Sequence, residues 1–92
     1  MPSRRISNWH YVYVLQSQID NNFYVGYTLN LRRRFDEHNA KKSFSTATRA
    51  PFTMIYVEAC KNEHDAKRRE RYLKTTQGRR FLKLRIRNFL KS

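Results

Sequence analysis

Three short runs of hydrophobic and aromatic residues predict the strands of this chain. The first, residues 9–15, reads Trp-His-Tyr-Val-Tyr-Val-Leu and is apolar on both faces, which is typical of a strand covered on both sides. The second, residues 23–27, follows a polar connection that contains the turn residues Asp20-Asn21-Asn22. The third runs from Phe52 to Cys60, directly after Pro51.

The first two strands suggest a hairpin with a definite register. If the hairpin is centred on the connection at residues 16–22, residues whose numbers sum to about 37 face one another. Tyr13 then lies near Tyr24, and two phenols stand side by side on one face of the sheet. A slip by one residue would move Tyr24 to the opposite face, so this pairing is a hypothesis.

Apolar positions at helical spacing predict a first helix after the second strand. Asn30 or Thr28 can cap it, and its apolar contacts Leu31 and Phe35 are four residues apart.

Two more helices follow the third strand. Asn62 caps a helix over Glu63 to Lys74, and Asp65 in its first turn complements the helix dipole. Gly78 is expected to separate this helix from a last one, about Arg79 to Leu90.

The order strand, strand, helix, strand, helix, helix indicates an α/β fold with a small, three-stranded, mostly antiparallel sheet flanked by helices. At 92 residues the chain can build a single modest core. We expect residues 1–8 to form a flexible basic leader and residues 9–92 to form one domain.

The charge of the chain points to a polyanionic partner. Twenty Lys and Arg against seven Asp and Glu give a formal net charge of +13. Nucleic acid is the first candidate, and an anionic membrane surface, which a basic amphipathic helix can bind, is the second. The sequence contains no apolar run of membrane-spanning length and no signal peptide, so we expect a cytoplasmic protein without a membrane partner.

One carboxylate falls where the second predicted helix should be apolar. Its core stripe contains Ala66 and Leu73, and Glu70 lies between them on the same face. A buried charge requires a cation or a metal ion. The pattern therefore leaves two interpretations, an ion pair with a neighbouring arginine or a metal ligand.

Several polar side chains converge near Gly26. Arg34 and His38 lie four residues apart on the apolar edge of the first helix. Separately, Arg34 is explained by a solvated basic face and His38 by an ordinary surface or core histidine. Together with Glu70 and the tyrosines they suit phosphodiester hydrolysis, which needs a base for water, positive charge at the phosphorus centre and help for the leaving oxygen.

This constellation resembles the GIY-YIG nucleases. Tyr11-Val12-Tyr13 stands at the first signature triplet, with Tyr11 in place of the leading glycine, and Tyr24-Val25-Gly26 is the second. Arg34 follows that glycine by eight positions, His38 follows Arg34 by four, and Glu70 lies in the helix after the third strand. The resemblance is closest to small single-domain members, similar to the N-terminal nuclease module of the bacterial excision-repair incision enzyme.

The resemblance implies a metal-dependent endonuclease and a role for each residue. Tyr24, or His38 in some family mechanisms, would activate water, and Tyr13 would position the water or the phosphate. Arg34 would stabilise the developing charge, and Glu70 would bind a single Mg²⁺ or Mn²⁺ ion. The glycine of the second triplet would keep this corner open.

Charged residues outside this corner are expected to contact the nucleic-acid backbone. From residue 65 onward the chain has eleven Lys and Arg and only two acidic residues. The expected backbone contacts are Arg32, Arg33, Lys41, Lys42, Arg49, Arg79 and Arg80. The expected substrate is DNA rather than RNA, cut with low sequence preference and selected by its structure, as in repair or recombination. The alternative is a non-catalytic DNA- or RNA-binding protein that retains the nuclease fold.

Overall fold

The structure is a computed structural model and describes residues 8–92. The predicted leader at residues 1–8 therefore lies, apart from Asn8, outside the described residues. The elements in chain order are β1 (His10–Ser17), β2 (Phe23–Thr28), α1 (Leu31–Asn39), the 3₁₀ turn η1 (Ala47–Arg49), β3 (Phe52–Cys60), α2 (Glu63–Leu73), α3 (Thr76–Arg85) and α4 (Arg87–Lys91). The predicted α/β fold and element order are confirmed.

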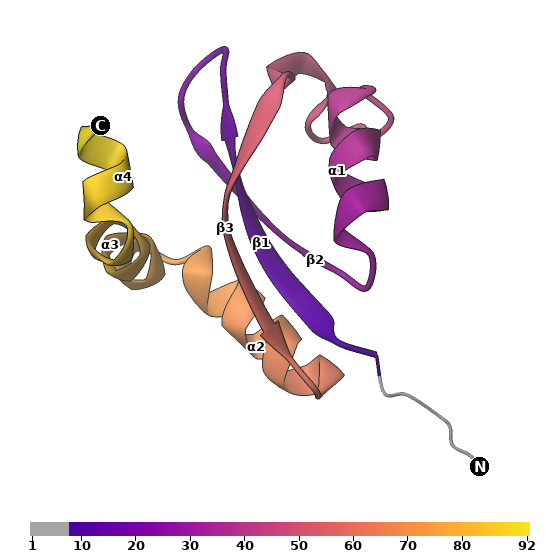
Figure 1. Ribbon diagram of the computed structural model, residues 1–92, viewed down its shortest axis with the longest axis vertical. Coiled ribbons are helices and arrows are strands. Elements are labelled where there is room, and N and C mark those ends of the chain that lie inside the picture. Colours follow the sequence, from indigo (N-terminus) through magenta and orange to yellow (C-terminus); the bar gives the residue numbers. More distant parts are fainter. Residues whose placement is uncertain (1–7) are drawn as a thin grey trace.

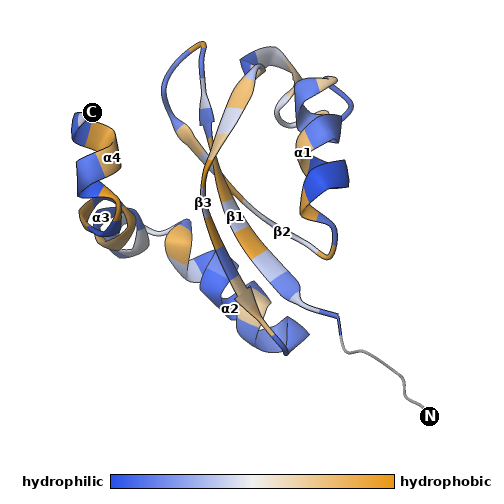
Figure 2. Cartoon of the chain, in the orientation of Figure 1, coloured by the Kyte–Doolittle hydropathy of each residue, from blue (hydrophilic) through white to orange (hydrophobic). Residues whose placement is uncertain are grey.

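The strands form one antiparallel sheet in the order β2-β1-β3, with β1 in the centre. The central residues of β1 are buried because helices cover both faces of the sheet (Figure 1). Hydrophobic colour is concentrated along the strands and on the inward sides of the helices (Figure 2). The sheet is therefore the middle layer of three.

The two faces of the sheet carry separate halves of the core. On one face, Val12 and Val14 of β1 pack with Ala66 and Leu73 of α2 and with Leu82 of α3. The alternate residues of β1 point to the other face, where the apolar side of α1 covers them. This second half of the core contains Tyr13, Leu15, Ala50 and Phe52, with Tyr24, Leu31 and Phe35 packed against it. Candidate site residues from β1 and β2 therefore face α1.

The hairpin register differs from the expected one by two residues. Tyr13 pairs with Gly26, and Leu15 pairs with Tyr24. The expected Tyr13–Tyr24 pairing was wrong because Ser17 extends β1 and closes the hairpin, its N–H donating to the Asn22 carbonyl at 3.0 Å. A shift by two residues keeps every side chain on its face, so both tyrosines still point toward α1.

Polar caps define where the helices begin. The side chain of Asn30 accepts a hydrogen bond from the N–H of Arg33 at the start of α1. Asn62 does the same for the N–H groups of His64 and Asp65 at the start of α2. Both predicted caps are thus in place.

The predicted last helix begins earlier, as α3, and is interrupted at Ile86 before α4, and Gly78 does not separate two helices. The hydroxyl of Thr75 accepts a hydrogen bond from the N–H of Gly78 and caps α3, and the glycine is buried inside the helix. A Cβ atom at Gly78 would lie 1.9 Å from the carbonyl oxygen of Tyr72. The glycine therefore allows α3 to approach the end of α2. No helix within residues 8–92 has the length and apolar character needed to cross a membrane.

Candidate active site

The hydroxyl of Tyr13 lies directly over Gly26 on the α1 side of the sheet. Tyr13 is only 1% exposed. A Cβ atom at position 26 would lie 2.3 Å from the Tyr13 oxygen, far closer than atoms can approach. Gly26 therefore makes room for the phenol of the neighbouring strand, whereas the motif resemblance implied that it would leave the corner open.

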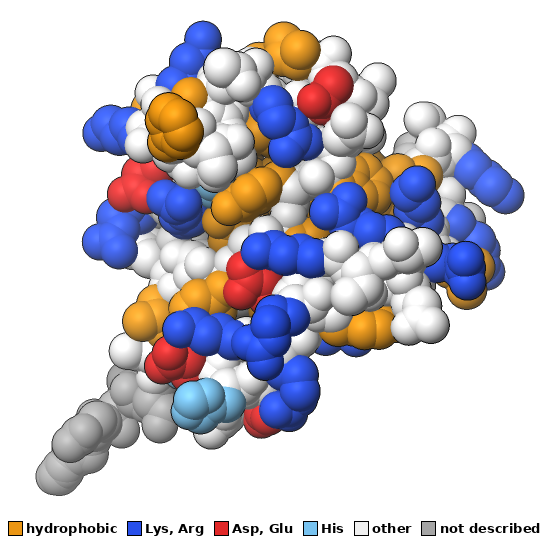
Figure 3. Space-filling model, turned by 180° about the vertical axis from the view of Figure 1, so that it is seen from behind, with side chains coloured by type: hydrophobic (Ala, Val, Ile, Leu, Met, Phe, Trp, Pro, Cys, Tyr) orange, Lys and Arg blue, Asp and Glu red, His pale blue; other side chains and the backbone are white. Residues whose placement is uncertain are grey.

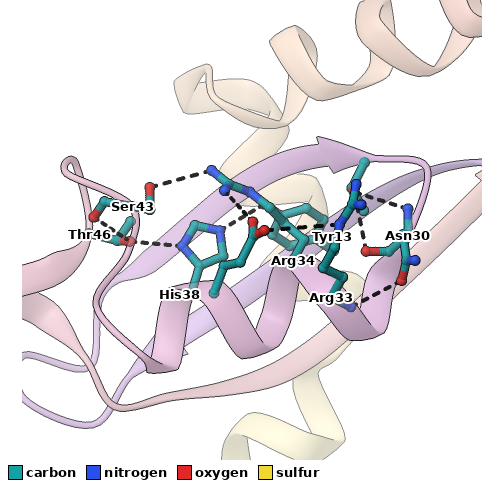
Figure 4. Close-up of polar contacts among 9 residues, drawn as sticks. Tyr13, Asn30, Arg33, Arg34, His38, Ser43 and Thr46 are labelled. Carbon is teal, nitrogen blue, oxygen red and sulfur yellow. Dashed lines mark hydrogen bonds and ion pairs between the residues drawn. The ribbon is translucent and has the colours of Figure 1, made fainter.

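His38 holds that phenol from the last turn of α1. Its side chain is fully buried, with Nε2 2.9 Å from the Tyr13 hydroxyl and Nδ1 2.8 Å from Oγ1 of Thr46 (Figure 4). The Thr46 hydroxyl donates to the Ser43 carbonyl at 3.5 Å, so it accepts the proton of His38 Nδ1. We therefore assign the proton on Nδ1, which leaves Nε2 to accept the hydrogen bond of Tyr13.

The environment keeps both members of this pair uncharged at neutral pH. Burial and, less strongly, the positive charge of Arg34 lower the pKa of His38 to about 4, while the charge of Glu37 opposes the shift. Burial also raises the pKa of Tyr13 to about 12, against the effect of the adjacent Arg34. Tyr13 is therefore a protonated phenol that donates to a neutral imidazole.

Arg34 lies beside the Tyr13 hydroxyl and is held by two further contacts. Its Nη1 lies 3.0 Å from Oε1 of Glu37, and its Nη2 donates to the Ser43 hydroxyl at 3.4 Å (Figure 4). One third of its side chain is exposed. Of the three consecutive arginines in α1, Arg34 is thus the one turned toward the sheet, as its place beside Leu31 and Phe35 predicts.

Tyr24 completes an aromatic cluster with Tyr13 and His38. Its ring centroid is 6.4 Å from that of Tyr13 and 5.1 Å from that of His38. Tyr24 is only partly buried, whereas the other two are closed off from solvent. Among these three aromatic side chains, Tyr24 is consequently the one that a water molecule or a phosphate reaches most readily.

Glu70 approaches from the helix on the opposite face of the sheet. Its side chain is 19% exposed and its carboxylate lies 3.0 Å from Nζ of Lys74, one turn further along α2. The charge of Glu70 contributes to the raised pKa of Tyr13, so the two groups lie within electrostatic range. The expected inward carboxylate is thus largely buried, and its ion-pair partner is a lysine rather than an arginine.

A mostly hydrated divalent ion fits this carboxylate. Within residues 8–92 no group of three or more His, Cys, Asp or Glu side chains could hold a metal ion. Mg²⁺ commonly takes only one or two protein carboxylates and keeps several waters, so a single carboxylate satisfies it. Glu70 is the residue that would hold such an ion.

Two of the expected backbone contacts are engaged inside the fold. Arg49 forms an ion pair with Asp20, its Nε 3.2 Å from Oδ2, and its guanidinium lies 5.8 Å from the ring centroid of Phe52. Arg79 donates from Nε to the carbonyl of Leu73 at 2.9 Å and so joins α3 to the end of α2. These contacts tie both arginines to the chain's own structure.

The other expected backbone contacts are exposed. They are Arg32 and Arg33 of α1, Lys41 and Lys42 after it, and Arg80 of α3. Seen from behind, Lys and Arg side chains spread over much of the surface, with few Asp and Glu among them (Figure 3). These five exposed basic residues are available to a polyanion.

Sequence reasoning missed the supporting roles of Ser43 and Thr46. Both are buried, and each anchors one of the polar site residues, Arg34 or His38. The hydroxyl-rich segment at 39–50 has the composition of a loop suited to phosphate contacts. Its only signal for the supporting role was the presence of several hydroxyls after His38.

The fold and this arrangement define a member of the GIY-YIG family, whose catalytic domain matches residues 9–84 of the chain. Within that family the chain belongs with the small UPF0213 proteins. The UPF0213 protein SH2523 of Staphylococcus haemolyticus is 40% identical over 76 residues, which cover 82% of this chain and 92% of that protein. A UPF0213 protein of Halobacterium salinarum, VNG_2274C, is 38% identical over 66 residues, or 71% of this chain and 84% of that protein.

A solved structure shows the same relationship. The solution NMR structure of the UPF0213 protein BH0048 from Bacillus halodurans has a TM-score of 0.51 and 31% identity, covering 80% of this chain and 81% of that one. The resemblance stated from the sequence motifs is confirmed. Membership points to a nuclease that binds nucleic acid, and GIY-YIG nucleases generally use a divalent metal ion.

Proposed function

We propose that this protein is a metal-dependent endonuclease that hydrolyses DNA phosphodiester bonds. One observation carries the proposal: the Tyr13 hydroxyl is fixed over Gly26 by His38 and lies beside Arg34. Arg34, one third exposed and held beside that phenol, offers its guanidinium to an anionic oxygen. Such a preorganised donor stabilises charge that develops in a transition state.

The residues divide the work of hydrolysis between them. Tyr24, the most accessible of the aromatic cluster, is placed to take a proton from the attacking water once its own hydroxyl proton has passed to solvent. The buried Tyr13 hydroxyl positions the guanidinium of Arg34, which offsets the negative charge that grows on the phosphate oxygens. His38 is buried with both ring nitrogens bonded, so we assign it the role of holding Tyr13 rather than of contacting water.

The proposed metal ion is a single Mg²⁺ or Mn²⁺ held by Glu70. When bound, it would supply positive charge that helps the leaving oxygen depart. The carboxylate is largely buried and within electrostatic range of Tyr13, which supports its belonging to the same site. Lys74, now paired with Glu70, neutralises the carboxylate in the free protein.

The proposed substrate is DNA, cut with little regard to sequence, inside the cytoplasm. The exposed basic residues suit the phosphate backbone, and backbone contacts fix register without reading bases. Selection by DNA structure, as in repair or recombination, is the form of specificity that such a surface supports.

A cleavage assay with purified protein tests the proposal. Nicked plasmid, branched DNA, single-stranded DNA and matching RNA are incubated with Mg²⁺, with Mn²⁺ or with EDTA. We expect DNA cleavage that needs the metal and is lost in both Glu70→Ala and Arg34→Ala. The matched control is Glu63→Ala, which removes an exposed carboxylate from the same helix and should leave the rate unchanged.

The assay also separates the alternative. Cleavage that survives the double variant Glu70→Ala, Arg34→Ala would come from a contaminant, and the proposal would fail. Salt-dependent binding without metal-dependent cleavage of any substrate would instead identify a non-catalytic nucleic-acid-binding protein. Faster cleavage of RNA than of DNA would show that RNA, and not DNA, is the preferred substrate.

A further inference from the structure

Phe44 projects entirely into solvent beside the candidate active site. Its side chain is 99% exposed, whereas the other exposed aromatic residues among those described, such as Trp9 and Phe89, are 47% exposed. Full exposure of a phenylalanine gives up all the stabilisation that burial would provide. Folding therefore supplies no reason for the position of this ring.

The loop that presents Phe44 is anchored on both sides to site residues. Ser43, immediately before it, accepts a hydrogen bond from Arg34, and Thr46, two residues after it, bonds to His38 at 2.8 Å. The N–H of Thr46 also donates to the Ser43 carbonyl at 3.1 Å, which closes the turn. Ser43 and Thr46 are both buried, so the exposed ring stands on a fixed base.

The surroundings of the ring are cationic. Lys41 and Lys42 precede the turn and are exposed, and Arg34, which is paired with Glu37, donates to Ser43 at the start of the turn. An apolar ring among positive charges complements a partner that combines negative charge with flat apolar faces. Nucleic acid has both, because phosphates alternate with bases and every base has a π face.

We propose that Phe44 stacks on a base of the substrate next to the phosphate held by Arg34. This inference rests on the proposed function, since it takes that phosphate as the one to be cut. An aromatic ring stacks on any base, so Phe44 would bind the strand without recognising its sequence. It also requires a base whose face is free, at an end, a gap, a bulge or an unpaired stretch.

Binding measured in EDTA tests the stacking without any chemistry. A short oligonucleotide with an unpaired stretch is titrated against the wild type, Phe44→Ala, Phe44→Leu and Phe44→Trp. We expect Phe44→Ala to weaken binding about 5- to 150-fold, and Phe44→Leu to recover little of it. Phe44→Trp should bind at least as well as the wild type, and its added fluorescence should be quenched by the oligonucleotide.

The matched control is Leu84→Ala, which removes a 62% exposed apolar side chain from α3, on the other face of the sheet. It should bind like the wild type. Wild-type affinity in Phe44→Ala, or full recovery by Phe44→Leu, would overturn the inference. So would unchanged oligonucleotide binding together with weaker binding of Phe44→Ala to vesicles of anionic lipid, since Phe44 would then serve a membrane contact.

The outcome is distinguishable from that of the cleavage assay. If Phe44→Ala loses binding while the wild type cuts nothing, the stacking contact stands and the catalytic proposal fails. If the wild type cuts and Phe44→Ala binds normally, only the stacking contact fails. Because the ring touches nothing buried, the circular-dichroism spectrum of every Phe44 variant should match that of the wild type.

Discussion

His38 is the residue on which the site geometry depends most. It joins Tyr13 of the central strand to Thr46 of the following loop, and it does so as a neutral ring in a fully buried position. A charged imidazole there would lose the acceptor that Tyr13 needs and would add a cation beside Arg34. The neutral state of one side chain therefore supports both the site and the packing of α1.

This neutral state predicts a loss of stability in mild acid. The unfolded chain protonates His38 near pH 6.5, but the folded chain does so only near pH 4. Between these values protons bind the unfolded state preferentially, so the free energy of unfolding falls as the pH falls. From pH 7 to pH 5 the loss attributable to His38 should be roughly 2 kcal/mol, at about 1.4 kcal/mol per pH unit below 6.5.

Urea unfolding at intervals between pH 7 and pH 5 measures this loss. The range stays above the ordinary pKa of Glu, about 4.3, so carboxylates contribute little. His38→Gln keeps polar groups near both partners but does not titrate, and its stability should change much less across the same range. Parallel curves for the two proteins would show that the histidine is already protonated or exposed in the folded state.

The elements show what the sequence could predict and why. The sequence pattern of β1 and β2 placed Tyr13 and Tyr24 on one face correctly, because successive side chains of a strand point to alternate faces of the sheet. It did not fix the register, since a shift by two leaves the same pattern and the turn bonds of Ser17 decide it. Likewise, glycine commonly ends helices, but only the contact with Tyr72 shows why Gly78 lies inside one.

The site was predictable as a set of residues but not as a network. The spacing of Arg34 and His38 placed both on one side of α1, and the helical stripe turned Glu70 inward. Hydrogen bonds to Ser43 and Thr46 depend on the path of an irregular loop, which no periodic pattern encodes. The ion-pair partner of Glu70 was also open, because periodicity does not choose among neighbouring cations.

The pairing of Glu70 with Lys74 within α2 yields a prediction about metal binding. A lysine 3.0 Å from the carboxylate competes with a metal ion for the same oxygens. Lys74→Gln should therefore raise the affinity of the free protein for Mn²⁺. Half of the lysine side chain is exposed, and such pairs contribute up to about 1 kcal/mol, so the gain should be at most about fivefold.

Calorimetric titration of the free protein with Mn²⁺ measures this gain. Arg68→Gln, which breaks an exposed ion pair with Asp65 on the same helix, is the matched control and should leave the affinity unchanged. Unchanged affinity in Lys74→Gln together with wild-type Mn²⁺ affinity in Glu70→Gln would mean that the ion does not bind at Glu70.

At the scale of the whole molecule, the net charge of +13 is larger than the number of basic side chains that we expect to contact a nucleic acid. Arg49 and Arg79 are bonded within the fold, and several other cations pair with carboxylates on their own helix. Of the other cations, many of which are exposed, the five basic residues named above are the predicted backbone contacts. Each phosphate that a protein neutralises releases about 0.9 of a counterion from duplex DNA, and the logarithm of affinity falls with the logarithm of salt concentration in proportion.

For binding to duplex DNA, these five contacts predict a slope of about −4 to −5 in a plot of the logarithm of affinity against the logarithm of salt concentration. The magnitude of this slope is well below the one that the net charge suggests. The double variant Lys41→Gln, Lys42→Gln should reduce its magnitude by nearly 2, because it removes two exposed cations beside the Phe44 turn. Arg49→Gln should leave the slope unchanged, because that arginine is already paired with Asp20. Fluorescence anisotropy at five or six salt concentrations in EDTA provides the slopes. A slope reduced in magnitude by about 1 in Arg49→Gln would show that Arg49 leaves Asp20 to bind phosphate, and that the fold opens its own ion pair to hold the substrate.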